Sequence, residues 1–160
     1  AGAREPLSEI LLPSPSDLLR LSSEIRHWLE NRQRNVEGAR RDFESAAQGA
    51  IALDASYFAP VVAISPAHRA TLKRLWAMDS SAFRHAPRGG GLVLMRATLD
   101  EFEARWVALE LIRNSLRKGK TSAAMLAVAA DAYRQVSAAL TDAIGLTHAL
   151  DQELTEKMEH

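Results

Sequence analysis

Apolar residues recur at alternating steps of three and four along most of the chain, and this spacing predicts long amphipathic α-helices. The first helix is expected to begin at Ser16 and Asp17, which supply an N-cap and a first-turn acid. Its apolar face consists of Leu18, Ser22, Ile25, Leu29, Arg32, Val36, Ala39, Phe43, Ala46 and Ala50. The last helix is expected to begin at Thr121 or Ser122. Its unbroken heptad stripe, typical of supercoiled packing, comprises Leu126, Ala129, Tyr133, Val136, Leu140, Ala143, Thr147, Leu150 and Leu154.

Two further helices are predicted between these. Ser65 followed by Pro66 is a typical helix start, and the helix that it opens should end at the glycine-rich stretch of residues 85–91. The next helix can begin at Gly91, because its stripe precedes the Thr98 capping box. That stripe comprises Leu92, Met95, Leu99, Phe102, Trp106, Leu109, Arg113 and Leu116. Residues 49–65 follow neither helical nor strand periodicity and contain Pro60, so they predict a buried, partly helical connection.

This pattern predicts an all-α protein: an antiparallel up-down-up-down four-helix bundle over residues 16–160, with long first and last helices. Three prolines, Pro6, Pro13 and Pro15, exclude one continuous helix from residues 1–15, which predicts a proline-rich N-terminal arm. Tryptophans 28, 76 and 106 are expected in core layers. In architecture, the arrangement resembles the four-helix sensory domains of bacterial chemoreceptors and sensor kinases.

Composition narrows the function classes. The 160 residues fit one domain, and 20 basic against 20 acidic residues give no net charge, so no overall field favours nucleic acid. The chain has no cysteine, which excludes disulfides and thiol catalysis. No apolar run is long enough to span a membrane. The start, Ala1-Gly2-Ala3, suggests a processed chain or a piece of a longer one, and an exported or periplasmic location is favoured over a cytoplasmic one.

Residues 117–122, RKGKTS, end like a phosphate-binding loop, but Asn114 stands where that loop needs its first glycine. We instead predict a turn in which Gly119 is a left-handed helix cap and Thr121 caps the next helix. The turn belongs to the most basic stretch of the chain, an exposed tip that can contact an anion, an acidic partner or a lipid headgroup. The basic residues are Arg113, Arg117, Lys118 and Lys120.

Three polar residues occupy packing positions: Arg32, Arg113 and Thr147. A cation in a helix seam is unfavourable unless it is paired or hydrated. Arg32 is therefore expected to reach the bundle edge, to meet a carboxylate such as Asp142 or Asp151, or to bind an acidic ligand or a second subunit.

Catalytic and metal-binding patterns are weak. Glu24 and His27 have the spacing of di-iron bundles, but the sequence lacks a second copy of that unit. No Gly-x-Ser-x-Gly nucleophile motif occurs. We therefore predict neither enzymatic activity nor a metal or cofactor. The expected function is a non-enzymatic binding module, sensory or exported, for a small anionic ligand or a second subunit. The alternative is a structural or accessory subunit of a larger assembly.

Overall fold

The computed structural model describes residues 15–83, 90–119 and 121–159. Within these ranges the chain is helical and contains no strand, which confirms the all-α prediction. The elements are α2 (Pro15–Ala47), the 3-10 helix η1 (Ala55–Phe58), α3 (Pro66–Phe83), α4 (Gly90–Lys118) and α5 (Ala123–Glu159). The predicted N-terminal arm lies outside the described residues except for Pro15, which opens α2.

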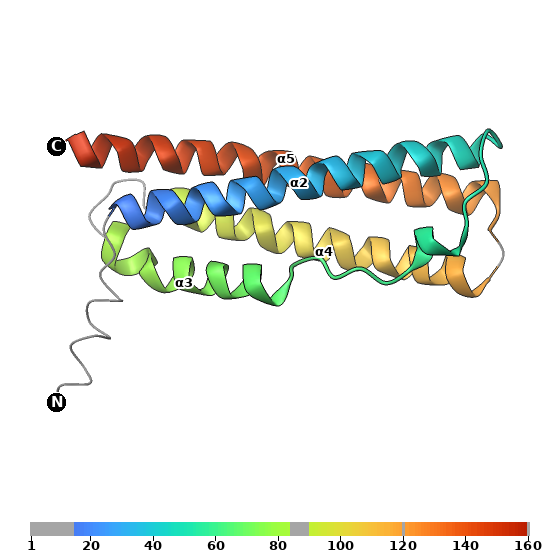
Figure 1. Ribbon diagram of the computed structural model, residues 1–160, viewed down its shortest axis with the longest axis horizontal. Helices are drawn as coiled ribbons and strands as arrows, with labels where there is room; N and C mark the ends of the chain where they lie inside the picture. Colours follow the sequence, from blue (N-terminus) through green and yellow to red (C-terminus); the bar gives the residue numbers. More distant parts are fainter. Residues whose placement is uncertain (1–14, 84–89, 120, 160) are drawn as a thin grey trace, which may run out of the picture.

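The longest helices, α2 with 33 residues and α5 with 37, pack against each other along their length (Figure 1). Their side-chain contacts show that they run antiparallel. The Arg26 guanidinium pairs with Asp151, the Gln33 amide donates to the Ser137 carbonyl, and Arg134 pairs with Glu44. As a result, α2 begins and α5 ends at the same end of the molecule (Figure 1).

The core follows the predicted stripes closely. Every stripe residue of α5 from Leu126 to Leu154 is buried, and so is every stripe residue of α4 from Met95 to Leu116. Aromatic rings join the helices, since Phe43 lies 6.0 Å from Phe58 and 5.1 Å from Tyr133 between ring centroids. Two of the tryptophans are buried as expected. The third, Trp76, is only half-buried.

Helix ends are capped, but not always where glycine suggests. Ser65 caps α3 as predicted, because its hydroxyl accepts the backbone N–H of His68 at 3.3 Å. Ser122 rather than Thr121 caps α5 by accepting the N–H of Met125 at 3.2 Å. The predicted left-handed cap at Gly119 is wrong. Among the described residues the positive φ, 77°, is at Gly49, where the N–H groups of residues 49 and 50 close the end of α2.

The segment from residue 48 to residue 65, here called the linker, differs most from expectation. Residues 49–65 were predicted to form a buried, partly helical connection. The helical part is present as η1, but most of these residues are exposed, and Phe58 and Ile64 are the buried ones. The helix α3 begins at Pro66, as predicted, but its 18 residues are too few to cover the 29 residues of α4. Where α3 is missing, the extended linker lies along α4 instead (Figure 1).

Candidate functional site: a groove between the linker and α4

Three buried or half-buried side chains hold the linker against the bundle, and all of them donate to main-chain oxygens. The indole N–H of Trp106 donates to the Val61 carbonyl at 3.1 Å. The Arg113 guanidinium donates to the carbonyls of Tyr57 at 3.0 Å and Ala59 at 2.5 Å. These bonds satisfy carbonyls that a helix would have bonded internally, so the linker can remain extended next to α4.

Arg32 joins this set from α2. Its guanidinium donates to the Val62 carbonyl at 3.3 Å and lies 5.3 Å from the centroid of the Trp106 ring. Burial lowers the pKa of Arg32 from its ordinary value. Neither predicted carboxylate pairs with it, and Asp151 bonds Arg26 instead. The expectation of an unusual seam cation was correct, but the cation contacts main-chain oxygen and an aromatic face.

Arg113 is the most deeply placed cation of the site, with 4% of its surface exposed. Besides the linker carbonyls it pairs with Glu110, one turn earlier on α4. Thr147 is also fully buried, and its hydroxyl donates to the Ile144 carbonyl at 2.6 Å. Its main-chain oxygen lies 3.4 Å from the Ser22 hydroxyl, near the start of α2. The side chains of Arg113 and Thr147 are both buried, and neither is among the residues that line the groove described below.

The predicted exposed basic stretch is exposed at Arg117 and Lys118 but not at Arg113, which is buried. Arg117 and Lys118 both face solvent, and Arg117 donates to the side-chain oxygen of Asn114. Lys120 lies outside the described residues. The structure therefore separates the predicted site residues into Thr147 near the helix termini, Arg32 and Arg113 beneath the linker, and the tip residues beyond.

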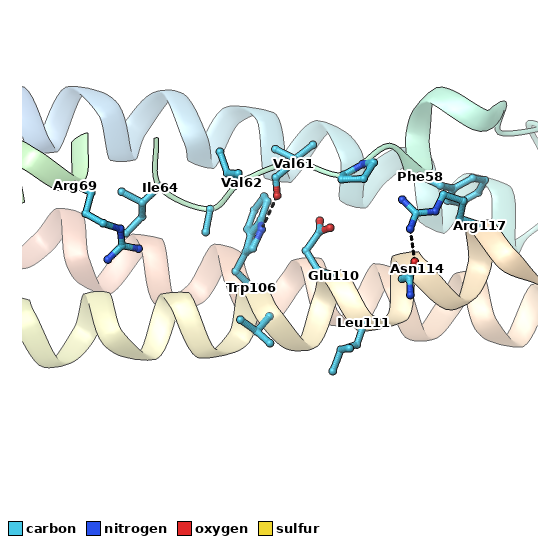
Figure 2. A pocket seen from close by; sticks show the side chains of 13 residues that line it. Phe58, Val61, Val62, Ile64, Arg69, Trp106, Glu110, Leu111, Asn114 and Arg117 are labelled. Carbon is cyan, nitrogen blue, oxygen red and sulfur yellow. Dashed lines mark hydrogen bonds between the residues drawn. The ribbon is translucent and has the colours of Figure 1, made fainter. Parts of the chain in front are cut away.

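Between the linker and α4 lies a groove of about 550 Å³ (Figure 2). Trp106 forms its floor, Val61 and Val62 line the linker side, and Val107 and Leu111 line the helix side. These wall residues are unusually exposed for their type, at 64% for both Val62 and Leu111 and 59% for Val107. A continuous exposed apolar surface of this kind marks a binding site more often than a random surface does.

Charged side chains stand at both ends of the groove (Figure 2). At one end Arg69 pairs with Glu103 at 3.0 Å. At the other, Arg117 contacts the neutral amide of Asn114, and no carboxylate in the described part of the chain pairs with it. Glu103, the partner of Arg69, precedes Arg117 by fourteen positions on α4, which is a rise of about 21 Å along the helix axis. The middle of the groove is therefore apolar except for Glu110, whose carboxylate pairs with Arg113, and a cation is available at the Arg117 end.

Sequence reasoning missed this groove, although two signals were present. Val107 and Leu111 lie off the core stripe of α4, where a fully solvated helix would carry polar residues. The valines of the linker belong to an apolar run without periodicity, which was interpreted as buried. The valines of the linker and the apolar residues of α4 form one surface only because the linker lies along α4.

The described residues contain no metal site of the kind that the spacing of Glu24 and His27 weakly suggests. Glu24 and His27 lie exposed on α2, and no three histidine or acidic side chains gather there or elsewhere in these ranges to hold a metal ion. None of the described helices is long and apolar enough to cross a membrane. No family model, curated protein or solved structure matches the chain.

Proposed function

We propose that this chain is a non-enzymatic binding module whose up-down-up-down bundle offers the groove to a small amphiphilic anion. The observation that carries the proposal is the combination of an apolar groove with the unneutralised guanidinium of Arg117 at its end. A volume of about 550 Å³ lies within the usual range of ligand sites. The location of the protein outside the cytoplasm stays a prediction.

The ligand class follows from the lining. An alkyl or aromatic body would lie on Trp106 between the valine walls and remove exposed apolar surface from water. A carboxylate or sulfonate at one end of the ligand would accept hydrogen bonds from the Arg117 guanidinium, which can donate two parallel bonds to such a group. Asn114 beside it offers an amide donor. Arg32 and Arg113 then act indirectly, by holding the linker wall in place.

The alternative function is a structural or accessory subunit of a larger assembly. The same exposed valines and leucine favour it, because such surfaces also bind proteins. A protein partner would not require the cation at the groove end. The two functions therefore differ in their dependence on Arg117.

The test is calorimetric titration of the purified protein with decanoate, below its micelle-forming concentration, and with decanol as the uncharged analogue. We expect saturable binding of decanoate that Arg117→Ala weakens about tenfold, the effect of one charge-assisted hydrogen bond. Lys73→Ala is the control, because Lys73 is an exposed cation of α3 that does not line the groove. Absence of saturable binding, or equal loss in both variants, would contradict the proposal.

A further inference from the structure

The surface of α4 opposite its core stripe carries a second regular pattern, here called the outer seam. Its residues are separated by four, three, four, three and four positions, the spacing of a coiled-coil contact. They are exposed except for Asn114, which is half-buried. In order they are Asp100, Ala104, Val107, Leu111, Asn114 and Lys118. Figure 2 shows Leu111 directed away from the linker, toward this outer side.

The outer seam is symmetric about the midpoint between Val107 and Leu111, since its spacing is the same in both directions. If a second copy of α4 lies antiparallel on it, Val107 of each copy is level with Leu111 of the other. Asp100 of each copy is then level with Lys118 of the other. Apolar residues meet at the centre and opposite charges meet at both ends.

From this self-complementarity we propose that the outer seam is a homodimer interface, in which two copies pack α4 against α4 in antiparallel directions. A two-fold axis would pass between Val107 and Leu111. The inference goes beyond the binding proposal and does not depend on it. The dimer would cover Val107 and Leu111, which also form the helix-side wall of the groove, whereas Arg117 lies about 100° around the helix from Lys118, on the linker side.

Charge selects the antiparallel arrangement over the parallel one. In a parallel pair, Asp100 would face Asp100 and Lys118 would face Lys118, which is unfavourable at both ends. Within the described part of the chain neither residue has an ion-pair partner of its own, so both are available. Ala104, level with Asn114 of the second copy, is small enough for the helices to approach closely.

The first test is the mass of the protein in solution, measured by sedimentation velocity over a concentration series. We expect a dimer. Asp100→Lys and Lys118→Asp should each weaken dimerisation at least about tenfold, because each replaces two attractive contacts with two repulsive ones. The double variant should restore it. A monomeric wild type, or a double variant no better than the single ones, would overturn the proposal.

An apolar control separates the outer seam from general stickiness. Leu111→Glu should abolish the dimer, whereas Leu94→Glu should not. Leu94 is also an exposed leucine of α4, at 57% against 64%, but it lies off the outer seam. Because both side chains are exposed, neither change should alter thermal unfolding of the monomer. Equal loss of the dimer in both variants would argue for non-specific association.

Engineered cysteines test the register, since the chain has none of its own. Ala108 flanks the outer seam near the axis, and the two copies of residue 108 would be offset by about 3 Å along the helices. The two copies of Ala97 would be offset by about 36 Å. A short bismaleimide should therefore cross-link Ala108→Cys and not Ala97→Cys, and the reverse result would overturn the register.

The two proposals fail separately. A wild-type monomer that binds decanoate through Arg117 removes the dimer and retains the binding module. A dimer that shows the predicted charge dependence but does not bind decanoate would support the interface and refute the ligand proposal.

Discussion

Arg113 offers the sharpest test of how the linker is held. Its buried guanidinium donates to the main-chain oxygens of Tyr57 and Ala59, and it pairs with Glu110. Replacement by methionine keeps an unbranched apolar stem but removes every donor. We therefore expect Arg113→Met to release the linker while the helices remain folded.

The magnitude can be worked from these contacts. A hydrogen bond from a charged donor contributes about 1.5 kcal/mol or more, so two of them contribute about 3 kcal/mol. Part of that loss is offset, because the variant no longer buries a charged group whose Nε has no partner. A net loss of about 2 kcal/mol remains, which corresponds to a fall in Tm of roughly 4 to 8 °C.

Chemical denaturation measures the stability loss, and hydrogen exchange locates it. The amides of Tyr57 and Ala59, which bond at η1, should exchange faster in the variant than in the wild type. Amides in the middle of α5 should change less. Arg117→Met is the control, since Arg117 is an exposed arginine of the same helix with a single neutral partner. Unchanged stability and unchanged exchange in the Arg113 variant would refute the view that this residue holds the linker.

Further predictions concern α2. The pKa of Glu44 lies below its ordinary value of 4.5 because its carboxylate accepts hydrogen bonds from Arg134 and Arg40. The contribution of Glu44 to stability is therefore fully present above pH 4.5 and is lost as the pH falls through the lowered pKa. The urea midpoints of wild type and Glu44→Gln should therefore differ at neutral pH and converge as the pH falls through the lowered pKa, and a constant difference would contradict this linkage. Gly49→Ala should destabilise the protein by about 1 kcal/mol, because alanine is strained at a φ of 77°. Gly38→Ala should instead stabilise it by about 0.5 kcal/mol or more, because that helical glycine has open space around it, and thermal melts showing the same sign for both would contradict the argument.

The helices of this protein were predictable because their signal is repeated. In α5 the stripe from Leu126 to Leu154 continues without a break, so one misjudged residue would not have changed the prediction. The start of α3 was equally secure, because Ser65 and Pro66 act through local geometry that needs no distant partner. Local, repeated patterns translate directly into structure.

The linker was not predictable, because its environment depends on distant residues. Arg32 and Arg113 were recognised as unusual seam cations, but the only partners within the chain that were expected for Arg32 were carboxylates. Main-chain oxygens carry no signature in a sequence, so the carbonyls of Val62 and Ala59 could not have been identified in advance. The groove was missed for the same reason.

Gly119 shows the limit of composition as a guide to conformation. Its N–H still bonds the Ser115 carbonyl at 3.0 Å, as in a helix, so the turn to α5 needs no left-handed residue there. Glycine permits a positive φ but does not require one.

The way the linker is fastened has a consequence for how this protein can change over time. The bonds by which Trp106, Arg32 and Arg113 hold the linker all go to main-chain oxygens, which every amino acid possesses. Mutations at Val61 or Val62 would therefore alter the shape and polarity of the groove without removing any of these hydrogen bonds. The residues that hold the linker and the residues that line the groove can therefore change independently in evolution, so related chains could bind new ligands while keeping one fold.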